Sequence, residues 1–96
     1  MKALCQPGAL AEMREAITWY AEVAGRRQAE ALNLEVNAKL ALLTGYPLIG
    51  TPGVGQTRSI PLKRFPYTLH YRVVGNVIDI LAVARQRRRP GYWRKR

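Results

Sequence analysis

The residues best suited to do chemistry are the basic and aromatic side chains at the C-terminal end of the chain. The sequence closes with Arg85-Gln86-Arg87-Arg88-Arg89-Pro90-Gly91-Tyr92-Trp93-Arg94-Lys95-Arg96. Guanidinium groups bind phosphate or carboxylate bidentately, and an aromatic ring beside them can stack on a base or fill a groove. Together with three basic residues earlier in the chain, this run supplies the expected target-binding residues: Arg58, Lys63, Arg64, Arg85, Arg87, Arg88, Arg89, Tyr92 and Trp93.

Residues 86–96 are named the C-terminal tail. A second interpretation of the tail carries equal weight: its arginines are solvated, and Tyr92 and Trp93 only pin it to the core.

Charge is unevenly distributed along the chain. Residues 1–48 hold five basic and five acidic side chains, whereas residues 49–96 hold eleven basic side chains and one acid, Asp79. The second half therefore carries the whole net charge of +10 and attracts polyanions or acidic protein segments.

Several classes of chemistry lack the residues they need. The sequence has no His/Cys/Asp/Glu cluster spaced for a metal, no glycine-rich phosphate loop and no Ser/His/Asp set, so we expect no metal and no cofactor. The single histidine, His70, is expected at the surface of a strand. The lone Cys5 fits a reducing cytoplasm, and no apolar run is long enough for a membrane span, so we expect a cytoplasmic protein.

Hydrophobic periodicity predicts an α+β fold in one domain, residues 1–96. Apolar residues recur every three or four positions from Gly8 to Gly25 and again from Arg27 to Thr44, which predicts two helices folded into an antiparallel hairpin. The glycines and prolines of Tyr46–Gly55 predict a loop without regular pairing. A short strand is expected at Lys2–Cys5, and another at Thr57–Leu62.

After this loop, the spacing of apolar residues changes from the helical period to the two-residue period of a strand. Alternation in Tyr67–Val73 predicts a half-buried strand, and the apolar run Val77–Ala84 predicts an interior strand. Gly75-Asn76 is a two-residue hairpin turn, whose register pairs residues with numbers that sum to 151. Arg72 then faces Asp79, and one face becomes uniformly apolar through the pairs Val73–Ile78, Tyr71–Ile80 and Leu69–Ala82. We expect the helical hairpin to cover that face.

Four segments together resemble the RelE/ParE superfamily of toxins from bacterial type II toxin–antitoxin modules. They are Ala11–Tyr20 in the first helix, Gly50-Thr51-Pro52-Gly53 in the loop, Phe65–Arg72 in the strand, and Arg89-Pro90-Gly91-Tyr92-Trp93 in the tail. The resemblance covers nearly the whole chain. It implies a small antiparallel sheet packed against an N-terminal helical hairpin, in the order β-α-α-β-β-β, and a cognate antitoxin that wraps and neutralises the toxin.

The superfamily combines two activities on one fold. RelE-like members cut messenger RNA on the ribosome with basic side chains and a C-terminal tyrosine, whereas ParE-like members lack this set and poison DNA gyrase. The basic positions of the RelE-like set fall here on neutral residues: Ser59, Pro61, Thr68 and Gln86. Many relatives also carry His at the position of Arg85. If the chain is a nuclease, its candidate catalytic residues are Tyr92, Arg88 and Arg85.

The resemblance therefore favours a ParE-like toxin that inhibits DNA gyrase and blocks replication. The alternative is a ribosome-dependent mRNA endonuclease, and a plain nucleic-acid-binding module is a third hypothesis. The expected partners are an antitoxin that offers an acidic or amphipathic segment, and either gyrase or the ribosome with its mRNA as target. No membrane partner is expected.

Overall fold

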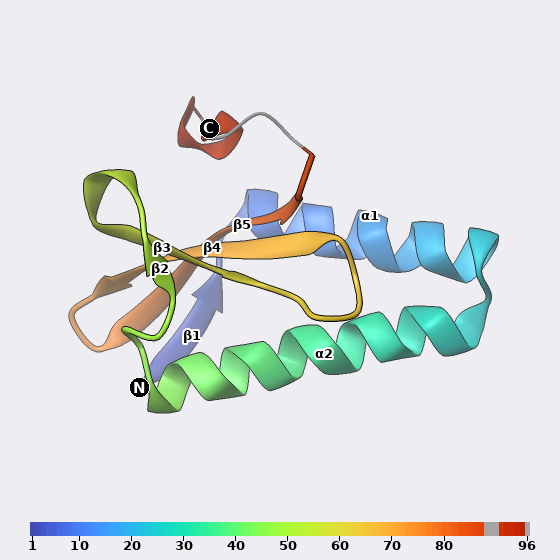
Figure 1. Cartoon of the computed structure of the whole chain (residues 1–96), viewed down its shortest axis with the longest axis horizontal. Helices are drawn as coiled ribbons and strands as arrows, with labels where there is room; N and C mark the ends of the chain where they lie inside the picture. Colours follow the sequence, from blue (N-terminus) through green and yellow to red (C-terminus); the bar gives the residue numbers. More distant parts are fainter. Residues whose placement is uncertain (88–90, 96) are drawn as a thin grey trace.

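The computed structural model describes residues 1–87 and 91–95 and has an α+β architecture (Figure 1). Two helices come early in the chain, and a five-stranded mixed sheet supplies most of the rest. The elements follow in the order β1 (Lys2–Cys5), α1 (Pro7–Val23), α2 (Arg26–Gly45), β2 (Thr51–Pro52), the 3-10 turn η1 (Val54–Gln56), β3 (Thr57–Pro61), β4 (Tyr67–Val74), β5 (Val77–Arg85) and the 3-10 turn η2 (Tyr92–Lys95).

Both predicted helices are confirmed, each within two residues of its expected ends. Pro7 occupies the first turn of α1, where its missing amide hydrogen costs nothing. Gly25 joins α1 to α2 with φ +95°, a conformation that glycine adopts without steric penalty. The chain therefore reverses within a few residues, and the two helices lie against each other as an antiparallel hairpin (Figure 1).

The sheet order is β1-β5-β4-β3-β2. The predicted strand at Lys2–Cys5 is confirmed and runs parallel to β5, while the other neighbours are antiparallel. The expected absence of pairing in Tyr46–Gly55 was wrong, because Thr51 and Pro52 pair with Ser59 and Arg58. Proline is tolerated there because β2 is an edge strand. The backbone amide hydrogen that proline lacks is not needed to pair with another strand on that side.

The hairpin register is confirmed near the turn and wrong farther from it. Arg72 pairs with Asp79, and their side chains form an ion pair at 3.7 Å. Leu69, however, pairs with Val83 instead of Ala82, because a bulge beside Tyr71 inserts an extra residue into β5. The shift carries the branched Val83 to the apolar face, where it joins the core.

The core lies between the helical hairpin and one face of the sheet. Tyr71, Leu32, Leu43, Leu69, Ile78, Ile80 and Val36 are its largest fully buried side chains. In Figure 1 the described part of the C-terminal tail lies on the side of the sheet opposite α2. Among the described residues, no helix combines the length and the apolarity that crossing a bilayer requires.

Candidate target-binding residues and the groove beside helix α1

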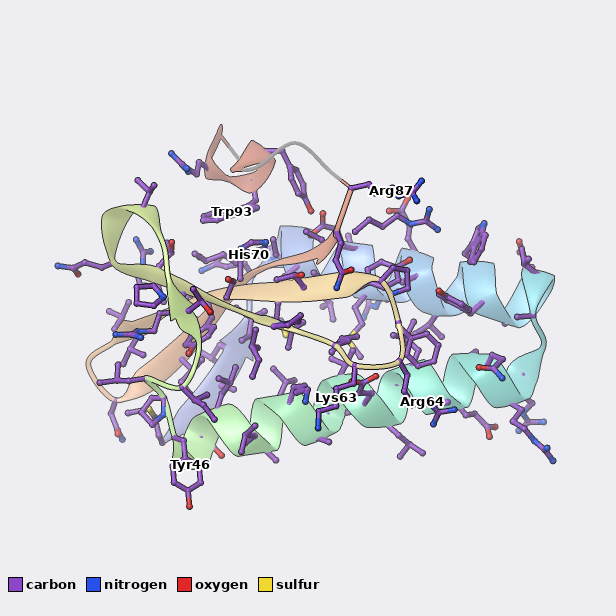
Figure 2. The ribbon with its side chains drawn as sticks, in the orientation of Figure 1. Tyr46, Lys63, Arg64, His70, Arg87 and Trp93 are labelled. Carbon is purple, nitrogen blue, oxygen red and sulfur yellow. The ribbon has the colours of Figure 1, made fainter. Side chains whose placement is uncertain are left out.

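The expected target-binding residues do not form one cluster. Lys63 and Arg64 lie in the β3–β4 connection on the α2 side of the sheet, whereas Arg87 and Trp93 lie on the opposite side (Figure 2). Arg88 and Arg89 fall outside the described residues. The remaining expected residues are Arg58 in β3, Arg85 at the end of β5, and Tyr92 in η2.

Arg58 holds the loop that leads from α2 to β2. Its Nη1 donates to the backbone carbonyls of Leu48 at 3.0 Å and Gly50 at 2.9 Å. The buried Tyr71 hydroxyl completes this clamp: it accepts from the Gly50 amide at 2.9 Å and donates to the Pro47 carbonyl at 2.8 Å. Arg58 therefore has a structural role in shaping the loop, which the sequence pattern does not reveal.

Lys63 and Arg64 are positioned by a carboxylate from α2. Glu35 accepts hydrogen bonds from the backbone amides of Lys63 at 2.5 Å and of Arg64 at 3.1 Å. These contacts fix the turn between β3 and β4 and leave both basic side chains exposed. Glu35 is absent from the expected site residues because its partners are backbone groups 28 and 29 positions away.

The C-terminal tail is attached to the fold by its two aromatic residues. The Trp93 ring packs on His70 with ring centroids 5.2 Å apart, and the Tyr92 hydroxyl donates to Oε2 of Glu12. Oε1 of the same carboxylate accepts from the backbone amide of Val83 at 3.0 Å. Glu12 thus links α1, β5 and the tail.

The expectation that His70 is a surface residue was wrong. His70 is half-buried because Trp93 lies over it, and this burial lowers the pKa of the imidazole while the Glu12 carboxylate acts in the opposite direction. The imidazole is therefore held mainly neutral at pH 7. The Trp93 Nε1 is buried without a hydrogen-bond partner among the described residues.

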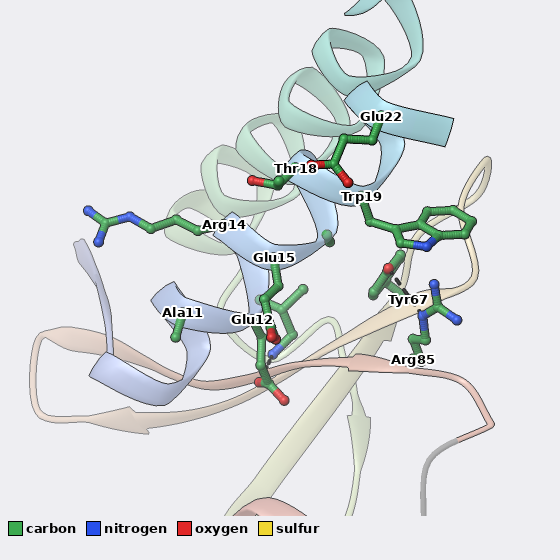
Figure 3. A pocket seen from close by; sticks show the side chains of 11 residues that line it. Ala11, Glu12, Arg14, Glu15, Thr18, Trp19, Glu22, Tyr67 and Arg85 are labelled. Carbon is green, nitrogen blue, oxygen red and sulfur yellow. Dashed lines mark hydrogen bonds between the residues drawn. The ribbon is translucent and has the colours of Figure 1, made fainter. Parts of the chain in front are cut away.

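Arg85 is exposed but held in place by two aromatic rings (Figure 3). Its guanidinium carbon lies 5.0 Å from the centre of the Trp19 ring and 5.8 Å from that of Tyr67. Its Nε donates to the Tyr67 hydroxyl at 3.3 Å, and this hydrogen bond raises the pKa of Arg85. Such stacking fixes the direction of the guanidinium.

A groove of about 680 Å³ lies between α1 and the end of β5 (Figure 3). Apolar lining comes from Ala11, Ala16, Val83 and the rings of Trp19 and Tyr67, and the charged lining residues are Glu12, Arg14, Glu15, Glu22 and Arg85. The described residues contain no group of three His, Cys, Asp or Glu side chains that could hold a metal ion. The groove combines apolar and charged lining residues and is suited to binding.

Three of the positions at which the resemblance to RelE-like nucleases implies basic residues, Ser59, Pro61 and Thr68, lie on one face of the sheet. Ser59 pairs with His70, and Pro61 pairs with Thr68, so these four side chains share the face on which Trp93 packs. Gln86 donates weakly to the Tyr67 carbonyl at 3.5 Å. Ser59, Pro61 and Thr68 are neutral, so these three side chains bring no positive charge to this face.

Comparison with known proteins agrees with this fold. A chain from a solved structure titled "Chromosomal ParDE TA system from P. aeruginosa" superposes with a TM-score of 0.78 at 24% identity, over 88% of this chain and 95% of that one. The search of curated proteins finds no significant match. The model of the family described as "ParE toxin of type II toxin-antitoxin system, parDE" matches residues 5–90. The chain therefore belongs to the ParE toxin family of type II toxin–antitoxin systems.

Proposed function

We propose that this ParE-family toxin inhibits DNA gyrase and thereby blocks replication in the cytoplasm. One structural observation supports this choice over the RNA-cleaving activity of RelE-like toxins. The sheet face under the tail carries Ser59, Pro61 and Thr68 where the nuclease needs cations. A phosphoryl transition state gains its stabilisation mainly from positive charge aimed at the phosphate, and none of these three side chains supplies it.

The position of Tyr92 agrees with a non-catalytic role. Its hydroxyl donates to Glu12, whose second oxygen is held by the Val83 amide. A tyrosine in this arrangement anchors the tail against α1 and β5. Tyr92 and Trp93 then hold the described part of the tail on one side of the sheet, from which the tail can contact the target.

We assign target contact to the tail, through Arg87, Arg88, Arg89 and Trp93, with Lys63 and Arg64 as a second basic patch. Long-range attraction by the net charge of +10 favours an acidic partner surface. The same charge favours a ParD-like antitoxin with an acidic or amphipathic segment as the neutralising partner. Formation of that complex should weaken as ionic strength rises.

The proposal is tested by a supercoiling and DNA-cleavage assay with purified gyrase. The wild-type protein should inhibit supercoiling, and the double variant Arg87→Gln/Trp93→Ala should inhibit at least tenfold less. Arg26→Gln is the matched control, because Arg26 is an exposed arginine at the start of α2 and its ion pair with Glu30 lies within one turn of the same helix. A parallel translation reaction measures mRNA cleavage. Cleavage of mRNA at concentrations that leave gyrase unaffected would refute the proposal.

A further inference from the structure

Three large apolar side chains are exposed close together in the loop that follows α2. Tyr46, Leu48 and Ile49 are 66%, 64% and 52% exposed. We name the segment Tyr46–Ile49 the apolar loop. Single exposed apolar residues are common on protein surfaces, whereas a contiguous apolar patch is typical of a site that another molecule covers. The apolar loop is therefore a candidate interaction surface.

Hydrogen bonds fix the backbone of the apolar loop. The amides of Tyr46 and Ile49 donate to backbone carbonyls at 2.9 Å and 3.1 Å. The carbonyls of Pro47 and Leu48 accept from two side chains of the sheet at 2.8 Å and 3.0 Å. The exposure of the apolar side chains is therefore a property of an ordered loop. Such a loop loses little conformational entropy when it binds, which favours association.

A hollow of about 270 Å³ lies beside the apolar loop and shares Leu48 with it. Its other apolar lining comes from Pro52 and Val73, and Arg58 lines it with Nη1 turned to the carbonyls of Leu48 and Gly50. Pockets for small-molecule ligands hold about 300–1,000 Å³, so this hollow is better matched to one side chain of another protein. The same surface thus offers exposed apolar side chains and a place that can receive one.

The distribution of charge indicates which molecule fits this surface. Residues 40–57 contain no charged side chain, although the whole chain carries a net charge of +10. An acidic partner gains no electrostatic attraction from such a surface. Two copies of the chain repel each other wherever their basic residues meet, so an uncharged surface is where they can approach most closely. Figure 2 shows Tyr46 on the side of the molecule opposite Arg87 and Trp93, so contact through the apolar loop keeps the two tails apart.

We propose that two copies of this chain form a twofold dimer, in which the apolar loop of each copy inserts a side chain into the hollow of the other. A twofold contact uses the same patch on both copies, and this patch has a projection and a hollow side by side. At Pro52 the outer edge of β2 has no amide hydrogen, which disfavours extension of the sheet by a partner strand. The contact is therefore made by side chains.

The size of the patch sets the expected strength of the dimer. A specific contact buries about 1,000 Å² in total or more, and three exposed side chains with a small hollow lie at the lower end of that range. We therefore expect a dissociation constant of about 1–100 μM. This dimer does not depend on the identity of the toxin's target, because the tail residues assigned to the target take no part in it.

The proposal is tested by sedimentation equilibrium of the full-length protein. Protein concentration is varied between about 1 and 500 μM, at ionic strengths of about 0.15 M and 1 M. The dimer should become tighter as salt increases, because salt screens the repulsion between two chains of charge +10 and leaves apolar contact intact. A complex held together by charge changes in the opposite direction. Backbone amide resonances that shift with protein concentration should centre on Leu48, Ile49 and Val73.

Leu48→Glu should weaken the dimer at least about tenfold, because each contact would then bury a carboxylate without a partner. Ile49→Glu tests the same contact from a second position. Leu34→Glu is the matched control, because it makes the same change in charge at a residue that is 69% exposed and lies about three turns of α2 before the apolar loop. The control should leave the dissociation constant within about twofold of the wild-type value. Circular dichroism checks that each variant is folded.

A monomeric mass at every concentration and at both ionic strengths would overturn the proposal and leave the apolar loop to a different protein. A dimer that weakens as salt increases would overturn it as well. So would equal weakening by Leu34→Glu and Leu48→Glu, because the contact would then lie outside the apolar loop.

Discussion

Replacing Gly50 with alanine should destabilise the protein through one identifiable contact. A Cβ at this position would lie 2.6 Å from the Tyr71 hydroxyl oxygen, 2.8 Å from Cε1 of the same ring and 2.9 Å from the Ser59 carbonyl oxygen. Tyr71 is fully buried and holds the loop by two hydrogen bonds, so the ring has no free space to enter. Overpacking of this kind costs about 1–3 kcal/mol, and loss of the two hydrogen bonds adds about 1 kcal/mol each.

We therefore expect Gly50→Ala to lower the free energy of unfolding by about 3–5 kcal/mol, measured by urea denaturation. Tyr71→Phe should cost about 2 kcal/mol, because it leaves the buried Gly50 amide without its acceptor. In the double variant the closest overlap is gone. Its loss of unfolding free energy should therefore be at least about 1 kcal/mol smaller than the sum of the losses in the two single variants. Gly45→Ala is the control, since no atom lies within 4 Å of its added Cβ. Equal effects of the Gly50 and Gly45 substitutions would refute the reasoning.

Three further predictions concern the tail and its supports. Glu12→Gln should lower the free energy of unfolding by about 1–2 kcal/mol, measured by urea denaturation, because one carboxylate accepts hydrogen bonds from both Val83 and Tyr92; an unchanged midpoint would contradict this role. Burial lowers the pKa of His70 in the folded state, so the unfolded state takes up the proton first as pH falls below about 6.5. Stability should therefore decrease on acidification through that range, and the decrease should be smaller in His70→Gln, measured by thermal unfolding between pH 5 and 8. Deletion of residues 87–96 should abolish growth inhibition and leave a folded core, checked by circular dichroism; a truncated protein that still kills would contradict the assignment of target contact to the tail.

Much of the fold follows from local patterns in the sequence. Apolar spacing predicts the helices, and the Gly75-Asn76 turn with the Arg72–Asp79 pair predicts the first part of the hairpin register. The bulge beside Tyr71 is not predictable in this way, because it depends on which of Ala82 and Val83 packs better against the helices. The loop before β2 is held by the Arg58 and Tyr71 clamp, which joins residues 8 to 24 positions apart and leaves no local sequence pattern.

The candidate site was less predictable than the fold. Charge alone places Arg58, Arg85 and the tail arginines in one set, yet Arg58 binds loop carbonyls and Arg85 stacks on Trp19. Glu12 and Glu35 could not be predicted from the sequence, because a carboxylate that accepts hydrogen bonds from backbone amides has no characteristic sequence spacing. The stacking of Trp93 on His70 is likewise a contact between the tail and β4 that no local motif encodes.

The proposed gyrase target is tested most directly in cells that express this chain without an antitoxin. DNA synthesis and protein synthesis are followed by pulse-labelling during the first minutes after induction, with a strain that produces the Arg87→Gln/Trp93→Ala variant as control. We expect DNA synthesis to fail first while translation continues, and the control strain to show neither effect. If translation stops first in cells that express the wild-type chain, the toxin acts on the ribosome or its mRNA, and the assignment to gyrase is wrong.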